Sequence, residues 1–422
     1  MKFPKKLFSA TTLSFIFKIS IGFNLIFFNK IALEVVDPTY LTEVVFYIHT
    51  LPLMIIFNTF GLKTLISKNQ NTNNSSLQHY NELHFFLISF FCTIIFSSIF
   101  FFATLNQYLL TSFLLKFISL NLFISCHQLF VSILMGKKNF LSANFFGGMQ
   151  MNGFAFGSIL NLYLIFLARK ESIINIEDFF NIIFNISLSI LIFILMFVFS
   201  KIKLVKKKTS FNLLFKKAGY IFLKQLSDKS TFNLDLIFLR IFIGENYIYG
   251  YSTFSSIARL ILTPRNIFPP ILVPFITEAI NSKNKNKLSF LRLISLIGSI
   301  LSLLVFIFIF LFFNELTDFY KVEMNKTMSL SILIILSLAN YISVVKGFPE
   351  LFLIIAEQEK NVFWGSVYAL VFFIISCVPL IYFFEVYGLL LAVFMFSLFK
   401  AIYMLNLLYK KFKISTLPGL RF

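Results

Sequence analysis

The chain has 422 residues, of which 58% are hydrophobic and only 13% are charged. Ordinary soluble domains carry about 25% charged residues, because their surface needs polar cover. This composition excludes a soluble enzyme and a disordered or fibrous chain, and it predicts an all-α polytopic membrane protein. The formal net charge is +19, which in a soluble protein would favour nucleic-acid binding.

Apolar stretches long enough to cross a bilayer recur along the whole chain, since a helix needs about 20 residues to span the hydrocarbon. Their expected bounds are 11–32, 41–66, 83–104, 109–135, 143–167, 179–200, 219–243, 248–278, 289–313, 328–356, 361–383 and 388–409. The pattern predicts twelve transmembrane helices. Because twelve is even, both termini lie on the same side of the membrane.

The basic loop residues gather on one side of this predicted topology. Most loop Lys and Arg lie on the side of the termini, above all in the segment 201–217, KIKLVKKKTSFNLLFKK. The positive-inside rule therefore places both termini in the cytoplasm. Basic loops facing anionic membrane lipids account for most of the charge, so no nucleic-acid partner is needed.

The basic segment lies at the midpoint and divides the chain into similar halves. A shift of 210 residues places Lys30 over Arg240 and His49 over Arg259. The matching span pattern predicts two pseudo-symmetric six-helix lobes of the same orientation, related by an axis along the membrane normal. The expected bounds are 1–200 for the N-lobe, 201–218 for the linker, 219–413 for the C-lobe and 414–422 for the tail.

Charged side chains also occur inside or near the spans, where each costs at least ~2.5–3.5 kcal/mol at mid-bilayer. The cations are Lys18, Lys116, Lys224, Lys229, Arg240, Arg259, Arg265, Lys346 and Lys400. The acids are Asp228, Asp235, Glu278 and Glu350, with Glu43 near a span end. Most of these groups must face a wet interior, form ion pairs or extend to an interface.

The place of a charged residue within its span favours one of these explanations over the others. Residues near span ends are expected to extend into the interface, and Lys116 is expected to reach the outer one. Lys346 and Glu350 are four residues apart, so they can pair on one helical face or serve a substrate. Asp235 is either a proton or cation site, a partner for a cavity cation, or a structural partner of Arg240 or Lys18.

The sequence contains no motif that indicates enzymatic activity. A GxxxxGK[ST] phosphate loop is absent, and so are a catalytic triad and a large loop that could hold a catalytic domain. The three cysteines and four histidines are scattered, which predicts neither a disulfide nor a metal site. We therefore expect a protein that is not an enzyme and carries no cofactor.

The stretch 233–288 has the most specific pattern in the chain. It holds Asp235, a short Gly244-containing turn, Gly250-Tyr251-Ser252 and Pro274. Further motifs are Gly61-Leu62-Lys63-Thr64 and Tyr387-Gly388-Leu389. With these motifs the chain resembles the Wzx-type polysaccharide flippases of the multidrug/oligosaccharidyl-lipid/polysaccharide (MOP) exporter superfamily. Span eight departs from that pattern with extra prolines, so we expect it to be bent or unwound.

The resemblance implies a MATE-like fold with spans one, two, seven and eight lining a central cavity. It implies a flippase that moves polyprenyl-pyrophosphate-linked oligosaccharide for surface polysaccharides such as the O-antigen of lipopolysaccharide, by alternating access. The expected substrate-binding cations are Lys18, Arg259, Arg265, Lys346 and Lys400, and the expected ion-coupling or pairing acids are Asp228 and Asp235. Coupling to H⁺ or Na⁺ is part of this expectation. The alternatives are a MATE-type cation-coupled drug exporter and, less favoured, a membrane polysaccharide polymerase.

Overall fold

The computed structural model divides into two compact units, Met1–Lys229 and Ser230–Phe422. It describes residues 17, 20, 23–63, 65–66, 82–105, 113–136, 140–147, 154–199, 215, 218–219, 221–223, 225–226, 234–268, 272, 276, 285–356, 358–414 and 416–417. Lys18, Asp228, Glu278 and most of the predicted linker 201–218 lie outside these residues. The lobe bounds given above stay a prediction.

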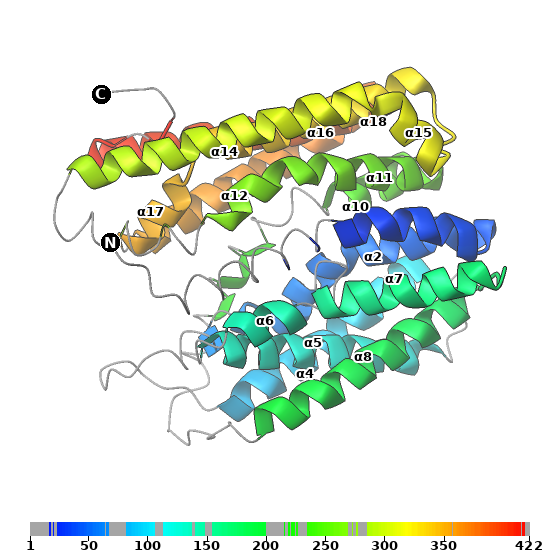
Figure 1. Ribbon diagram of the computed structural model, residues 1–422. Helices are drawn as coiled ribbons and strands as arrows, with labels where there is room; N and C mark the ends of the chain where they lie inside the picture. Colours follow the sequence, from blue (N-terminus) through cyan, green and yellow to red (C-terminus); the bar gives the residue numbers. More distant parts are fainter. Residues whose placement is uncertain are drawn as a thin grey trace. The chain divides into compact units, whose positions relative to one another are not determined.

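Both units are built from helices (Figure 1). The first contains a helix over residues 23–35, then α2 (Pro38–Thr59), α4 (Glu82–Phe100) with a π-helical end at Phe101–Leu105, α5 (Leu114–Gly136), α6 (Phe140–Phe146), α7 (Phe154–Arg169) and α8 (Ile176–Phe199). The second contains α10 (Leu234–Phe242), η3 (Glu245–Tyr247), α11 (Ile248–Ala258), η4 (Arg259–Leu262), α12 (Thr263–Ile267), α14 (Lys285–Leu311), α15 (Phe313–Tyr320), α16 (Lys326–Val345), α17 (Pro349–Ile355) and α18 (Glu359–Phe412).

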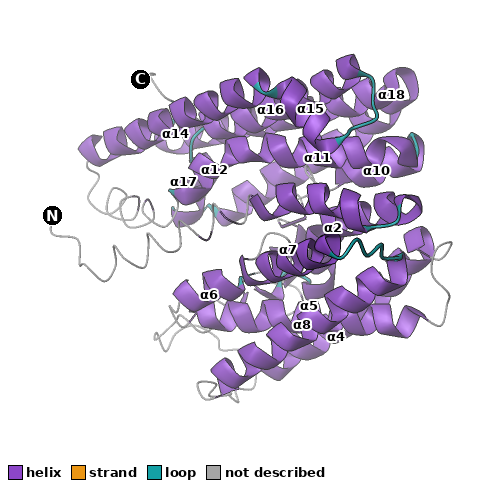
Figure 2. Ribbon diagram, turned by 45° about the vertical axis from the view of Figure 1, so that its right-hand side comes forward, coloured by secondary structure: helices purple, strands orange, loops and turns teal. Residues whose placement is uncertain are grey.

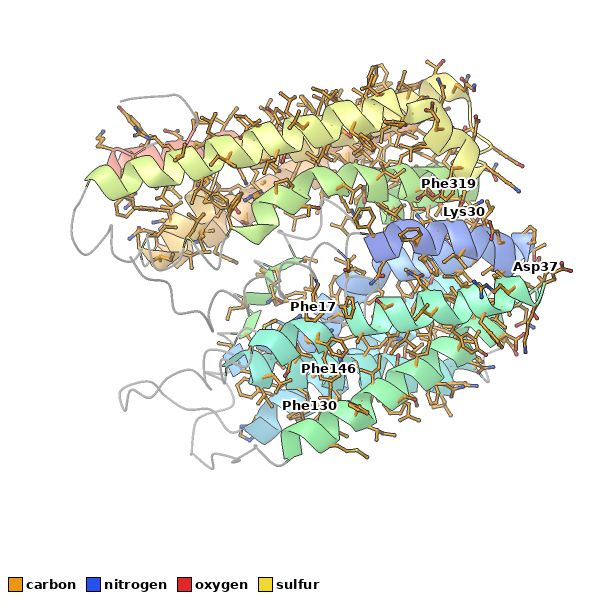
Figure 3. The ribbon with its side chains drawn as sticks, in the orientation of Figure 1. Phe17, Lys30, Asp37, Phe130, Phe146 and Phe319 are labelled. Carbon is orange, nitrogen blue, oxygen red and sulfur yellow. The ribbon has the colours of Figure 1, made fainter. Side chains whose placement is uncertain are left out.

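The described residues form no sheet (Figure 2), and the one β-type contact is an isolated bridge between Val36 and Ile174. The Asp37 amide donates to the Ile174 carbonyl at 3.0 Å, which ties the turn before α2 to the connection between α7 and α8. The Asp37 carboxylate caps α2 at the end of this unit (Figure 3). Its hydrogen bonds from the Thr39 hydroxyl and amide lower the pKa of Asp37.

The core of the first unit is aromatic. Tyr47 of α2 packs against the rings of Phe100, Phe117 and Phe180, with centroids 4.8–6.5 Å apart. These side chains come from α2, α4, α5 and α8, so one cluster joins four helices. Edge-to-face ring contacts of this kind add to the burial of apolar area. The abundant phenylalanines therefore act here as packing residues.

In the second unit, α16 contacts α11, α14 and α18. The opposite face of α14 is exposed and apolar, with Leu293, Ile297, Ile300 and Leu304 each 42–57% exposed. Among the described residues, seven helices are long and apolar enough to cross a membrane. An apolar face of this size is expected where lipid takes the place of water. The chain is thus a multi-pass membrane protein; the total of twelve spans remains a prediction.

The structure alters three of the expected spans. The span 328–356 is two helices, because α16 ends at Val345 and Gly347 adopts a left-handed φ of 72° before Pro349 begins α17. The spans 361–383 and 388–409 are separated only by a backbone break at Glu385 within α18. The break lies within residues 384–387, the interval that the expected bounds leave between these two spans.

Span eight is interrupted, as its prolines predict. The α-helix α11 ends at Ala258, a 3₁₀ turn follows over Arg259–Leu262, and α12 starts with Pro264 in its first turn. Proline lacks the amide that would continue the helical ladder. The other prolines of span eight, Pro269, Pro270 and Pro274, lie outside the described residues.

One pair of helices, one in each unit, begins at positions related by the 210-residue shift. α2 starts at Pro38 and α11 starts at Ile248, 210 residues later. This is the shift found in the sequence. Six-helix lobes remain a prediction, since parts of both units are not described.

Candidate functional site: a cationic cluster around Glu350

Three of the predicted substrate cations meet at one carboxylate in the second unit. Lys346 Nζ lies 2.6 Å from Glu350 Oε1, Arg265 Nη2 lies 3.6 Å from Oε2, and Lys400 Nζ lies 3.9 Å from Oε1. We call these four residues the Glu350 cluster. Three cations face one anion, so these four residues together carry a formal charge of +2.

Four separate elements supply the Glu350 cluster. Arg265 comes from α12, Lys346 follows the last residue of α16, Glu350 lies in the first turn of α17, and Lys400 lies in the part of α18 after its break. The Lys346 and Lys400 side chains are 4% and 10% exposed, whereas those of Arg265 and Glu350 are 20% exposed. Two cations are therefore almost withdrawn from solvent, and one edge of the cluster remains accessible.

The Lys346–Glu350 pair expected from the sequence is present, but it does not lie on one helical face. Lys346 follows α16 and Glu350 belongs to α17, so the pair bridges the break at Gly347. A continuous helix would also place residues four apart together. Here the left-handed Gly347 turns the chain between them.

Two further segments close around this break. Thr416, beyond the end of α18, donates its hydroxyl to the Lys346 carbonyl at 2.7 Å. A Cβ built on Gly347 would lie 2.6 Å from Ser295 Oγ and 2.9 Å from the Thr416 carbonyl oxygen. Only glycine fits this position without a rearrangement.

Arg259 belongs to a different environment in the same unit. Asp235 is buried and accepts a hydrogen bond of 2.8 Å from the Tyr251 hydroxyl. Arg259 lies near enough to Asp235 to influence it electrostatically. Asp235 is thus held between α10 and α11, and its expected roles in ion coupling or in pairing with a cation remain predictions. Arg240, its other expected partner, makes an ion pair of 3.0 Å with Glu245.

The first unit has polar contacts that sequence reasoning missed. Lys63 donates to Gln128 at 2.6 Å, and the buried His49 contacts Asn29 at 3.2 Å. Lys116, which we expected to extend to the outer interface, donates to the Asn181 side chain beside two phenylalanine rings. Asn181 lies near the start of α8, and the expected place at the interface remains a prediction.

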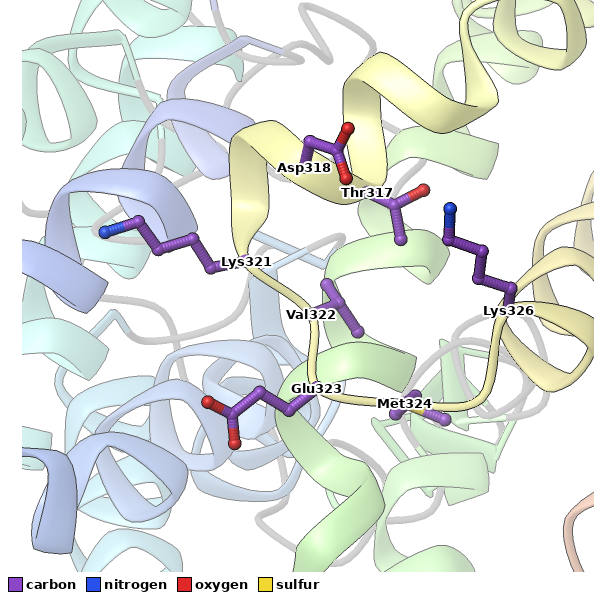
Figure 4. A pocket seen from close by; sticks show the side chains of 7 residues that line it. All are labelled: Thr317, Asp318, Lys321, Val322, Glu323, Met324 and Lys326. Carbon is purple, nitrogen blue, oxygen red and sulfur yellow. The ribbon is translucent and has the colours of Figure 1, made fainter.

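A surface cavity of about 390 Å³ lies at the connection between α15 and α16 (Figure 4). Its lining includes Asp318, Glu323, Lys321 and Lys326. Both signs of charge alternate around it, so it has no electrostatic preference for an anion or a cation.

No metal-type cluster of His, Cys, Asp and Glu occurs among the described residues. The three cysteines are free thiols.

Glu350 is the residue of the site that the sequence revealed least. It was visible only as a neighbour of Lys346, because its other two partners lie on α12 and α18, far away in sequence. The break that positions it had a signal: Gly347 followed by Pro349 is the usual end of one helix and start of another. Tyr251 had no signal beyond its place in the Gly250-Tyr251-Ser252 motif.

Solved structures of MATE family transporters of the MOP superfamily share this fold. An inward-facing multidrug resistance transporter of this family is 14% identical, with a TM-score of 0.62 over 94% of this chain and 99% of that one. The MATE multidrug transporter DinF-BH has a TM-score of 0.61 at 14% identity, over 97% and 96% of the two chains. A MOP superfamily transporter from Pyrococcus furiosus, described by the reverse polarity of its binding pocket, has a TM-score of 0.60 at 14% identity, over 95% of each chain.

These similarities establish the MATE-like fold that the sequence predicted. No family model matches the sequence. The search of curated proteins likewise gave no match. At this identity the fold alone is shared, and the substrate has to be argued from the site.

Proposed function

We propose that this protein is a flippase that moves polyprenyl-pyrophosphate-linked oligosaccharide across the bacterial cytoplasmic membrane by alternating access. The observation that carries the proposal is the Glu350 cluster. A pyrophosphate diester bears two negative charges, and the four residues of the cluster together carry a formal charge of +2. Cations held away from solvent inside a membrane protein are costly, so we expect these to have a function.

The fold supports transport, and the charge supports an anionic head group. The sugar-bearing diphosphate would bind the cations of the second unit while the lipid tail stays in the bilayer. Arg guanidinium can bind two phosphate oxygens at once, and Lys contributes a point charge. Lys18 and Arg259 remain candidate substrate cations, and Asp228 and Asp235 remain candidates for coupling to H⁺ or Na⁺.

A MATE-type drug exporter is the second candidate. The structural neighbours favour it, because several are described as multidrug transporters. The excess of cations in the Glu350 cluster argues against it, since a cationic drug would be repelled. The pocket polarity of the Pyrococcus furiosus transporter supports the idea that proteins of this fold differ in the charge that they accept.

Deletion of the gene tests the proposal in the host. We expect undecaprenyl-pyrophosphate-linked oligosaccharide to accumulate on the inner leaflet and surface polymer to disappear, with drug susceptibility unchanged. The measurements are the lipid-linked sugar profile and the drug inhibitory concentrations. Normal surface polymer together with raised drug susceptibility would contradict the flippase and favour the exporter.

Variants of the Glu350 cluster then test the site. Arg265→Gln and Lys400→Gln each remove one charge-assisted contact, worth about 1.5–3 kcal/mol or roughly ten- to hundredfold in affinity. Both should fail to restore surface polymer in the deletion strain at normal membrane levels. Lys360→Gln is the matched control, because Lys360 is an exposed cation at the start of α18. If all three variants complement equally, the cluster does not bind substrate.

A further inference from the structure

Glu350 contacts the cations that the anionic substrate proposed above would bind. Both of its carboxylate oxygens face cations: Oε1 faces Lys346 and Lys400, and Oε2 faces Arg265. A substrate phosphate would need the same three side chains. Glu350 and the substrate therefore compete for them.

The carboxylate also holds the break between α16 and α17. Its contact with Lys346 is the shortest in the Glu350 cluster, 2.6 Å, and it joins the two sides of Gly347. On the far side of the break, Phe352 and Leu353 of α17 are buried in a core with Val362, Met404 and Leu408. Glu350 therefore lies in the same short helix as side chains that pack on α18.

We propose that Glu350 is an internal counter-anion that occupies the three cations while the site is empty and yields them to the substrate diphosphate, so that loading loosens the α16–α17 break. This inference rests on the proposed function, because it requires a diphosphate ligand. It adds a role for Glu350 that diphosphate recognition alone does not need. Glu350 would be a positioning residue, acting on the ligand through the cations.

The charge balance explains why a carrier would need such a residue. Three cations without a counter-ion repel one another in a medium of low dielectric constant. An exporter that works by alternating access must return empty, and Glu350 makes the empty cluster less costly. The same carboxylate repels the incoming phosphate, so it lowers the affinity of the site for the substrate. The substrate can then dissociate after it has crossed the membrane.

The loaded state then differs from the empty state at an identifiable place. When the diphosphate attracts Lys346, Lys400 and Arg265, the contacts that fix Glu350 weaken together. Gly347 and the Thr416 contact with the Lys346 carbonyl remain. The break is then held by the backbone rather than by the ion pair, and α17 can change its angle to α16.

Binding to the purified full-length protein tests the inference, with inorganic pyrophosphate as the probe and inorganic phosphate for comparison. Glu350→Gln keeps the size of the side chain and removes the competing charge. We expect it to bind pyrophosphate roughly ten- to hundredfold more tightly than the wild type and to lose complementation. Glu350→Asp keeps the charge and should bind nearly as the wild type does. Glu245→Gln is the matched control, since it removes an ion-paired carboxylate of the same unit outside the cluster.

The single tryptophan gives a second readout that needs no substitution at Glu350. Trp364 lies near the start of α18, beside Phe363, and α18 packs on α17. Pyrophosphate should change the Trp364 emission of the wild type, and empty Glu350→Gln should already resemble the loaded wild type. An unchanged emission on loading overturns the inference even if the Glu350→Gln variant does not fold.

The outcomes separate the two proposals. If neither the wild type nor Glu350→Gln binds pyrophosphate, the proposed diphosphate recognition is wrong, and the role of Glu350 is wrong with it. If the wild type binds and Glu350→Gln binds no more tightly, only the counter-anion inference is overturned. Tighter binding in Glu350→Gln, with transport lost and the Trp364 emission shifted, supports both.

Discussion

Tyr251 supplies the side-chain hydrogen bond of the buried Asp235 carboxylate, at 2.8 Å. Tyr251→Phe removes that hydroxyl and nothing else. A buried acceptor that loses a donor costs about 1–3 kcal/mol, and more when it is charged. We therefore expect the variant to unfold at a lower temperature in detergent, as followed by the loss of helical circular dichroism.

Tyr382→Phe is the control for this prediction, because Tyr382 is 82% exposed and lies in the same unit. It should leave the unfolding temperature unchanged. Equal unfolding temperatures for the wild type and Tyr251→Phe would show that water replaces the hydroxyl and that Asp235 is less isolated than its burial indicates. Arg259 would then carry more of the charge balance.

At the scale of helices, the break between α16 and α17 depends on one glycine. Gly347→Ala would place a methyl group 2.6 Å from Ser295 Oγ at a φ of 72°, which costs about 1–3 kcal/mol in strain before any clash. We expect a lower unfolding temperature and weaker complementation. Gly219→Ala is the control, because a Cβ there meets nothing within 4 Å. A Gly347→Ala variant as stable as the wild type would show that the break can shift along the chain.

The break between α16 and α17 also shows what could not be predicted from the sequence. Hydropathy located the membrane-crossing segments because an apolar run of about 20 residues is a local property. It overlooked the break at Gly347, since mean hydropathy does not respond to a single left-handed residue. The prolines of span eight did predict an interruption, and a 3₁₀ turn at Arg259–Leu262 confirms it. An interruption of a helix could therefore be predicted from the sequence where prolines cause it.

The sequence predicted the members of the Glu350 cluster but not most of their contacts. Arg265, Lys346 and Lys400 were identified because a charge inside an apolar run is conspicuous and costly. Their meeting at Glu350 depends on how α12, α16, α17 and α18 pack, which is a tertiary property. Lys116 shows the same limit: without the fold, its partner Asn181 on α8 could not be known.

At the scale of the whole molecule, charge has two separate roles. Loop cations set the orientation in the membrane, whereas buried cations such as Lys346 and Lys400 are held by specific partners. The first role follows from counting along the sequence. The second needs the contacts. A +19 chain can thus be explained without nucleic acid only if the predicted orientation is correct.

That orientation is the last prediction. Both termini and the basic linker should be cytoplasmic, and the connection between α15 and α16 should be periplasmic, because the loop cations concentrate on the side of the linker. Reporter fusions after Lys207 and after Glu323 measure this directly. An alkaline phosphatase reporter should be active only after Glu323, and a green fluorescent reporter should be bright only after Lys207. Phosphatase activity after Lys207 would invert the topology, and the segment 201–217 would then face the periplasm, where no excess of basic residues is expected.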